Sequence, residues 1–531
     1  MGLANIGYLA GNINSIMDSM TFKVAEEPAK SSLVHDNASW FKIVLLILFF
    51  AATLLRLDDI KAPGHLLDRE YTSAIFARAY YFTNNDDIED WRRDIAIITK
   101  DQQPVLEPPL VEYLVSLIYR VMGMEEIYYS RYLTNAFWII GGVFMYLIGK
   151  KLLSANAALI ATAYYLFVPM GVIISRSFQP DSLMMMLFLM SLYSVIHYSD
   201  RHSTNRLLLA CVISGITLLL RPLVVFAIFG AFLALSIQQN RNWKGLINTP
   251  LIIFTSSSLL PAVIYYGYGI VFAGFMRWKI STSFMPYLLT KKDFWLGWFE
   301  LGADVAGPAL LLLAIVGFFF IQNKNAQYLV VGLVASYVVF GIAFTYHIHT
   351  HPYYHIQLIP IIGLCIAPVM LGIVNSLRQL LVKTWMVPVS AVLLIALYFS
   401  YREVHDSLYQ FHMEDPAVAH EIGEIVHHSP RTVFVSNYYG VPLEYYGEFG
   451  GAPWPVRIED AFYRRPGEPE LSVEERIDGL GFTPEYFVIT NFNLFNHKHQ
   501  DLRAYLENNC PILKETGAYL IYANCRIVSA H

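Results

Sequence analysis

The sequence predicts a polytopic α-helical membrane protein that ends in a small α/β domain outside the membrane. Its 531 residues are 55% hydrophobic and only 15% charged, and the apolar residues gather in long runs. Soluble domains carry more charge and shorter apolar stretches. The net charge is −5, so the chain has no basic excess with which to bind a nucleic-acid backbone.

Apolar runs of the length of a bilayer predict about eleven transmembrane helices, because one span needs about 20 residues. The runs begin near Phe41, Tyr129, Asn156, Ser182, Arg206, Leu223, Asn248, Val305, Gln327, Ile356 and Trp385. The two runs that flank Arg221-Pro222 are short, so one kinked helix is an alternative there.

The positions of lysine and arginine predict the orientation, because cytoplasmic loops carry the excess of these residues. With the N-terminus inside, one side of the membrane receives Lys150, Lys151, Arg201, Arg206, Arg241, Lys244, Lys324, Arg378 and Lys383. We therefore expect a multi-pass plasma (inner) membrane protein. Residues 1–39 form a cytoplasmic segment and residues 40–400 a transmembrane domain, while the outer loop 61–128 and the C-terminal domain 401–531 are extracytoplasmic.

The C-terminal domain has the composition of a soluble protein and is long enough for one small fold. Residues 432–435, 486–490 and 519–523 are predicted strands, and residues 499–508 a helix. Cys510 and Cys525 both lie in this domain. An oxidising compartment would permit a disulfide between them, which we favour over two free thiols.

The first outer loop places two carboxylates, Asp68 and Glu70, around Arg69 immediately after a membrane exit, in the sequence His65-Leu-Leu-Asp-Arg-Glu-Tyr71. At the N-terminus of a helix both carboxylates could reach one polar site. They are candidate catalytic groups. A capped, solvated helix at the interface is the alternative.

Three further motifs fall on the same predicted side. Glu107-Pro-Pro precedes an amphipathic run that contains Glu112, where the prolines fix a junction between loop and helix. A short hairpin holds Arg176 and Asp181, which either pair with each other or serve function at a helix mouth. Residues 347–355 read His-Ile-His-Thr-His-Pro-Tyr-Tyr-His. If that segment is extended, His347, His349 and His351 share a face, as a metal site or a phosphate cradle would require.

Several lysines and arginines fall on the predicted outer side, although these residues are usually concentrated in cytoplasmic loops. Their presence there suggests an anionic partner. They are Arg69, Arg176, Arg221, Arg277, Lys279, Lys291 and Lys292. Arginine forks suit phosphate oxygens, so a lipid-linked phosphate at the outer leaflet would satisfy them. Side chains that snorkel to lipid headgroups are the alternative.

Taken together and in this order, these motifs resemble the GT-C superfamily of membrane glycosyltransferases. The nearest branch is the one that holds the protein O-mannosyltransferases and the bacterial aminoarabinose transferases of lipid A. The resemblance covers residues 40–400. It implies a GT-C-like fold and an inverting transferase that takes a sugar from a polyprenyl-phosphate donor, among membrane lipids, and passes it to a hydroxyl acceptor of a protein, lipid or glycan on the extracytoplasmic face.

The resemblance also implies roles for single residues. Asp68 corresponds to the acidic residue proposed as general base, and Glu70 would orient the acceptor or hold a metal. The donor phosphate would contact Arg69, Arg176, Arg221, His349, His351, Tyr353 and Tyr354. The acceptor or sugar would contact Tyr71, Glu107, Glu112, Asp181, Arg277 and Lys279. Glu107 stands where aminoarabinose transferases carry lysine, which argues against aminoarabinose as the sugar and lipid A as the acceptor.

Two other classes compete with an enzyme. A transporter or flippase of a lipid-linked anionic substrate would place its ionisable residues near the midplane and show paired repeats, whereas here they cluster at one face and no internal repeat is evident. A receptor that uses the C-terminal domain to bind a partner leaves the outer motifs unexplained. No cofactor is required by the sequence, and a divalent metal is the candidate.

Overall fold

The computed structural model describes residues 38–62, 67–83, 85–240, 248–274, 283–382, 384–409, 415–454 and 471–525. Arg277 and Lys279, both predicted to bind acceptor or sugar, and His65 of the first motif lie outside the described residues.

Within this described part, seven helical segments are long and apolar enough to cross a membrane. They are α6 (Ile127–Leu152), α9 (Asp181–Asp200), the segment Pro222–Asn240 made of η1 (Pro222–Val224) and α11 (Val225–Asn240), α12 (Thr249–Val271), α16 (Lys324–Ala343), α18 (Leu358–Leu381) and α19 (Met386–Tyr409). Two bent pairs raise the number to nine. The polytopic helical fold is confirmed, whereas the count of eleven stays a prediction.

The bent pairs show how proline and glycine divide the apolar runs. Helix α7 (Ala155–Phe167) meets α8 (Pro169–Ser175) at an angle of 58°, and α14 (Lys292–Ala306) meets α15 (Pro308–Phe318) at 88°. Each second helix begins with proline, which lacks the N–H needed to continue a preceding helix. Gly307 makes the sharper bend with a φ of +84°, a value that favours glycine.

The remaining predicted spans correspond to α2 (Ala38–Leu57) and α10 (Thr204–Leu220). Helix α10 ends before Arg221, and the backbone of Arg221 is extended. The chain therefore forms two helices at Arg221-Pro222 rather than one kinked helix, because Pro222 cannot donate to the preceding turn.

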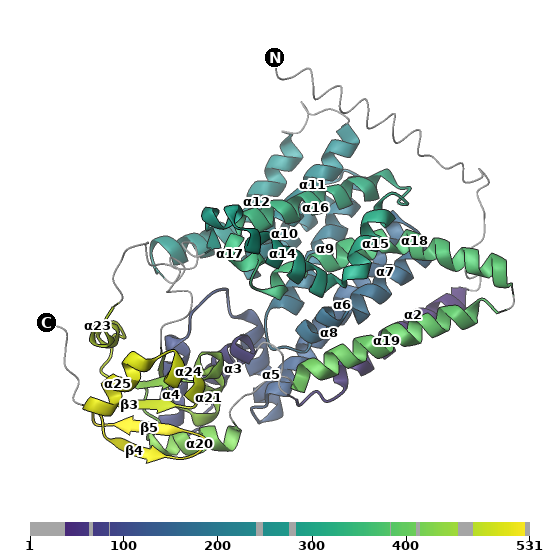
Figure 1. Ribbon diagram of the computed structural model, residues 1–531. Helices are drawn as coiled ribbons and strands as arrows, with labels where there is room; N and C mark the ends of the chain where they lie inside the picture. The colour runs from purple at the N-terminus through teal and green to yellow at the C-terminus, as the bar shows by residue number, and fades with distance from the viewer. Residues whose placement is uncertain are drawn as a thin grey trace. The chain divides into compact units, whose positions relative to one another are not determined.

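The spans pack around an apolar core drawn from α6, α7, α9, α10, α11, α16 and α18 (Figure 1). Most of α9 is buried among its neighbours, whereas α12 and α19 leave most of their apolar surface exposed. Exposed apolar side chains such as Val263, Leu394 and Phe399 are what a lipid-facing surface requires.

The predicted first outer loop is helical and contains α3 (Leu67–Thr83), α4 (Asp90–Gln102) and α5 (Leu110–Met122). Pro109 directly precedes α5, and Gly123 ends it with a φ of +68°. The predicted junction between loop and helix is therefore present. Between the spans lie η3 (Pro286–Thr290), α17 (Thr345–Ile348) and η4 (Pro352–His355).

The C-terminal domain is a five-stranded mixed sheet with helices on both faces, in the order β2-β1-β3-β5-β4 (Figure 1). Its strands are β1 (Thr432–Val435), β2 (Gly451–Pro453), β3 (Tyr486–Ile489), β4 (Ile512–Glu515) and β5 (Leu520–Ala523). Its helices are α20 (Pro416–Ile425), η5 (Asn437–Gly440), α21 (Val441–Gly447), α23 (Val473–Asp478), α24 (Phe492–His497) and α25 (Gln500–Asn509). The three predicted strands and the predicted helix are confirmed, and the α/β class with them.

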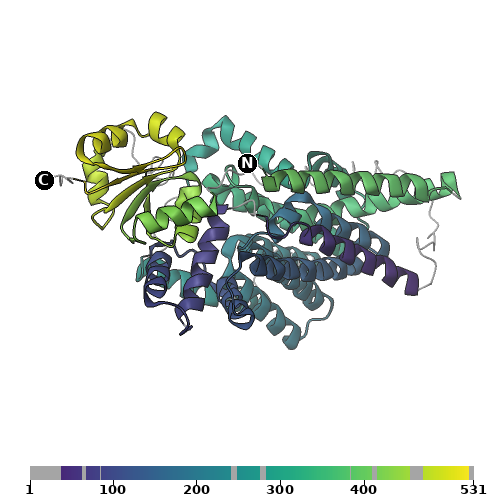
Figure 2. The ribbon, with the colours of Figure 1, turned by 90° about the horizontal axis from the view of Figure 1, so that it is seen from below.

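Alternation along the strands divides the core of this domain in two. Val433 and Val435 face α23, α24 and α25 on one side, while Phe434 faces α20 and α21 on the other. Successive side chains of a strand point to opposite faces, so a strand buried on both sides is apolar throughout. Both views show this domain beside α3 and α4 of the outer loop (Figures 1 and 2).

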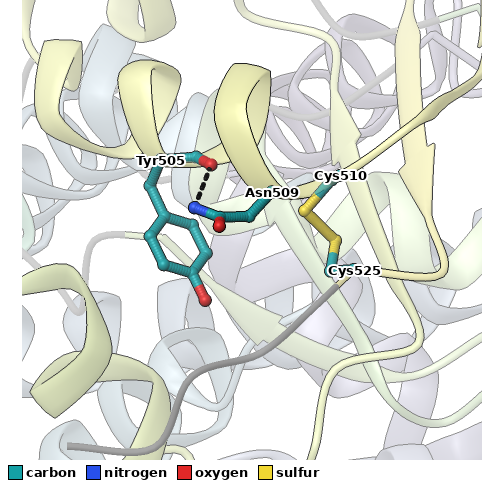
Figure 3. Close-up of a disulfide and its surroundings, with 4 residues drawn as sticks. All are labelled: Tyr505, Asn509, Cys510 and Cys525. Carbon is teal, nitrogen blue, oxygen red and sulfur yellow. Dashed lines mark hydrogen bonds between the residues drawn. A yellow bond between two sulfur atoms is a disulfide. The ribbon is translucent and has the colours of Figure 1, made fainter.

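A disulfide joins Cys510, just after α25, to Cys525, just after β5 (Figure 3). The predicted bridge is confirmed. Next to it, Asn509 donates a hydrogen bond to the backbone carbonyl of Tyr505 at 2.9 Å and so closes the last turn of α25. Cys211 and Cys365 are free and buried.

Candidate active site

A cluster of charged side chains forms where five segments of the fold meet. Its members come from the first turn of α3, the loop before α5, the first turn of α9, the residue after α10 and the η4 turn. They are Asp68, Arg69, Glu107, Asp181, Arg221, Tyr353 and Tyr354. All seven were singled out in the sequence, and their convergence is a result of the fold.

Glu107 holds two arginines together at the centre of this cluster. Its Oε1 accepts a hydrogen bond from Arg69 at 2.5 Å and another from Arg221 at 2.6 Å. Both guanidinium groups are largely withdrawn from solvent. A charge-assisted bond is roughly twice as strong as a neutral one. Glu107 therefore fixes two cations side by side that would otherwise repel each other.

Asp181 and Arg221 leave hydrogen-bonding capacity unused. Their side chains lie 3.2 Å apart as an ion pair, between Asp181 Oδ1 and Arg221 Nε. The geometry nevertheless leaves that Nε and both oxygens of Asp181 without a hydrogen bond among the described residues, although all three atoms are buried. Buried polar atoms are nearly always satisfied. Such orphaned atoms are typical of a site that takes a polar ligand.

Asp68 faces the same site with a carboxylate that has no hydrogen-bond or ion-pair partner among the described residues. Its backbone carbonyl accepts a bond from Thr72 at 2.7 Å, as in a regular helix. Burial raises the pKa of Tyr353 well above that of an exposed phenol, and the charge of Asp68 adds to this effect. The charge of Asp68 therefore acts on Tyr353, and no described side chain occupies the carboxylate.

Three aromatic rings lie in and just before the η4 turn, beside Arg221. The Arg221 guanidinium lies 6.0 Å from the centroid of the Tyr353 ring. Tyr353 and Tyr354 have centroids 5.0 Å apart, and the ring of His351 is 5.4 Å from that of Tyr353. Their hydroxyl and ring N–H groups add hydrogen-bonding capacity beside the two arginines.

Glu70 lies next to this cluster but has partners of its own. It is fully buried, and its Oε1 accepts a bond from Arg131 at 2.8 Å and from the backbone N–H of Phe178 at 3.3 Å. Arg131 also donates to the carbonyls of Ile60 and Ala62. The pair ties α3 to α6 and to the end of the first span, a structural position that orients the helix carrying Asp68.

The hairpin between α8 and α9 does not contain the ion pair that was considered for it. Arg176 donates to the backbone carbonyl of Asp59 at 2.9 Å. Asp181 instead pairs with Arg221, from another helix. Of the two alternatives for this hairpin, the pairing of Arg176 with Asp181 is therefore absent, because tertiary packing brings each of them to a group distant in sequence.

The histidine segment turns rather than extends, so His347 and His351 come together and His349 does not share their face. His351 donates its backbone N–H to His347 at 3.0 Å, and the two rings are 5.4 Å apart. His349 points elsewhere, with Nδ1 2.7 Å from the carbonyl of Thr345 and its ring against Phe294. In the described part of the chain, no three His, Cys, Asp or Glu side chains gather as metal ligands.

Glu112 on α5 and Tyr71 on α3 form hydrogen bonds with residues outside the Glu107 cluster. Glu112 is buried and accepts a hydrogen bond from Ser73 at 2.8 Å. Burial raises the pKa of Glu112 to about 7. The Tyr71 hydroxyl shares a hydrogen bond of 2.9 Å with that of Tyr446 in the C-terminal domain.

Neither Arg131 nor Tyr446 was predicted from the sequence. A signal for Arg131 was present, since it lies two residues inside the span predicted to begin near Tyr129, and an ionisable residue within a span is a functional or structural candidate. Tyr446 had no comparable signal, because only the docking of α21 on α3 brings it to Tyr71.

Residues 106–266 match the family model of dolichyl-phosphate-mannose-protein mannosyltransferases. That segment contains Glu107, Asp181 and Arg221. No curated protein matches by sequence.

Solved structures share the fold at low identity. ArnT from Cupriavidus metallidurans in the apo state has a TM-score of 0.55 at 14% identity over 93% of this chain and 98% of that one. The same protein bound to undecaprenyl phosphate gives 0.54 at 13%, over 93% of this chain and 98% of that one. The oligosaccharyltransferase AglB from Archaeoglobus fulgidus, with an inhibitory peptide and dolichol-phosphate, gives 0.52 at 11%, over 92% and 74%. The family-model match covers residues 106–266, and the solved structures share the fold of this chain.

Proposed function

We propose that this glycosyltransferase moves a sugar from a polyprenyl-phosphate carrier to a hydroxyl acceptor, with inversion at the anomeric carbon, on the extracytoplasmic face of the membrane. Two solved structures with the same fold were determined with undecaprenyl phosphate or dolichol-phosphate. The observation that carries the proposal is the meeting of Asp68, an available carboxylate, with two arginines held by Glu107.

Asp68 has the position and chemistry of a general base. The acceptor oxygen attacks the anomeric carbon from the face opposite the phosphate, and its proton passes to the Asp68 carboxylate. The bond between the anomeric carbon and the phosphate oxygen breaks, and its electron pair leaves on that oxygen. Attack from the opposite face inverts the anomeric centre. General-base catalysis contributes about 10²–10⁴ in rate.

Arg69 and Arg221 are suited to hold the departing phosphate. A guanidinium has five N–H donors, and Glu107 occupies one on each. The remaining donors include the unsatisfied Nε of Arg221. Fixed donors aimed at developing negative charge stabilise a transition state without reorganisation. The phosphate is a stable leaving group, so none of these steps requires a proton donor or a metal.

The orientation of the site is also part of the proposal. Loop charges favour a cytoplasmic N-terminus, and the disulfide between Cys510 and Cys525 favours an oxidising compartment for the C-terminal domain. This domain contacts the outer loop that carries Asp68, since α21 packs on α3. The site and the disulfide therefore lie on the same side.

The test is donor turnover by purified protein in lipid nanodiscs, with a panel of undecaprenyl- and dolichyl-phosphate-linked sugars and release of free polyprenyl phosphate as the signal. Asp68→Asn should lower turnover by about 10²–10⁴ and leave binding of undecaprenyl phosphate unchanged. Asp90→Asn is the matched control, an exposed aspartate in the first turn of α4, and should retain turnover.

Normal turnover of Asp68→Asn would remove Asp68 from the mechanism. Movement of an intact sugar-carrier across the bilayer, with no release of polyprenyl phosphate from any donor, would contradict transfer and favour a flippase.

A further inference from the structure

A polar cavity lies between the outer loop and the C-terminal domain. It has a volume of about 580 Å³ and is bounded by α3, the segment before α6, and α21. Ligand sites commonly have volumes of about 300–1,000 Å³ and occur between domains. The cavity is separate from the Glu107 cluster, whose members do not line it.

Aromatic rings supply much of the cavity wall. Tyr71, Tyr81, Tyr128, Tyr445 and Tyr446 all line it. Tyr71 packs against both tyrosines of α21, with ring centroids 5.3 and 5.4 Å away. Tyrosine offers a rigid apolar face together with a polar edge. A ligand with both C–H faces and hydroxyl groups fits such a wall.

Most charges of the cavity wall are paired. The lining includes Lys61, Arg78, Arg92 and Arg131 together with Glu125, Glu126 and Glu448, and Arg131 also bonds Glu70, which is fully buried and does not line the cavity. Arg78 bonds Glu125 at 2.8 Å, and Arg92 Nε bonds Glu448 at 2.8 Å. Because its three arginines are paired in this way, the lining offers little unpaired positive charge to a phosphate, a nucleic acid or an acidic peptide. Fixed ion pairs instead offer both donors and acceptors to neutral hydroxyl groups.

Helix α3 joins the cavity to the proposed base. Tyr71, which lines the cavity, follows Asp68 by three residues on α3, which corresponds to about 4.5 Å along the helix axis. An acceptor bound in the cavity would therefore extend along α3 to bring a hydroxyl group to Asp68.

We propose that this cavity binds a neutral saccharide that forms part of the acceptor, an inference that rests on the proposed function above. The acceptor is then a glycan, or a molecule that already carries a sugar. The C-terminal domain contributes to its recognition through Tyr445 and Tyr446.

Binding can be measured without any donor. Purified Asp68→Asn protein in nanodiscs is applied to a printed array of neutral glycans, acidic glycans and acidic peptides, and hits are quantified by titration. We expect preferential binding of neutral glycans. Tyr128→Ala should weaken it at least about five-fold, because an aromatic stacking surface is lost. Tyr132→Ala removes an exposed tyrosine one turn further along α6, outside the lining, and should bind normally.

Glu126→Gln provides a second variant, because this exposed carboxylate lines the cavity and can be replaced without disturbing the core. Its glycan affinity should fall as well. Binding that is restricted to acidic glycans or peptides, no binding to the array, or unchanged affinity in both lining variants would overturn the proposal. Donor turnover by wild-type protein in the absence of glycan binding would overturn this proposal alone, whereas glycan binding without turnover of any donor would contradict only the proposed reaction.

Discussion

Glu112 makes the stability of the outer loop depend on pH in a direction that the structure determines. Its carboxyl is buried against Ser73 on the face of α5 that packs on α3. Burial raises its pKa from 4.5 to about 7. A carboxyl with a raised pKa in the folded state contributes fully to stability only below its unfolded pKa, and that contribution is lost as pH rises through the folded pKa.

The magnitude follows from the shift. A difference of about 2.5 pKa units corresponds to about 3 kcal/mol, at about 1.4 kcal/mol per unit. The ionisation of Glu112 therefore lowers the free energy of unfolding by about 1 kcal/mol at pH 5 and by about 3 kcal/mol at pH 8. Glu112→Gln removes the ionisation and keeps an oxygen that can accept from Ser73, so its stability relative to wild type should rise by about 2 kcal/mol between these two pH values.

The assay compares thermal unfolding midpoints of wild type and Glu112→Gln in the same detergent at pH 5 and pH 8. The variant should gain on wild type at pH 8 relative to pH 5. Glu448→Gln is a control whose effect on stability should have the opposite sign. Burial opposes the charge of Glu448, but Arg92 and Arg78 lower its pKa overall. Its removal should therefore cost stability at neutral pH, and this cost should fade as pH falls through the folded pKa. A constant difference between Glu112→Gln and wild type at both pH values would refute the reasoning.

Three other variants test the packing around the site and in the C-terminal domain. Glu107→Gln should destabilise the protein by about 2 kcal/mol, because two buried guanidinium groups lose their carboxylate. Added undecaprenyl phosphate should restore part of the lost unfolding temperature. No recovery would argue against a phosphate at this position. Replacing Cys510 and Cys525 by serine should lower the free energy of unfolding of the C-terminal domain by about 3 kcal/mol, which proteolysis can measure. Protease resistance equal to that of the wild type would contradict this. Gly423→Ala places a Cβ 1.9 Å from the carbonyl oxygen of Gly447. It should therefore separate α20 from α21 at a cost of about 1–3 kcal/mol and lower the unfolding midpoint. An unchanged midpoint would show that the helices can move apart freely.

The candidate site illustrates how far sequence reasoning reaches. Asp68, Arg69, Glu107, Asp181 and Arg221 could be singled out because ionisable groups beside apolar spans are unusual. Their partners could not be predicted. Asp181 had an apparent partner in Arg176, five residues away, yet the fold gives it Arg221.

By itself, the sequence indicated the helical membrane fold and three strands and one helix of the C-terminal domain, and it favoured a disulfide over two free thiols there. These features depend on local patterns, such as the length of an apolar run or the alternation along a strand. Only the tertiary structure decided which charges meet. Glu107 lies 38 residues from Arg69 and 114 from Arg221, and Glu70 lies 61 from Arg131. Contacts over such separations depend on how whole helices pack, and no local pattern encodes them.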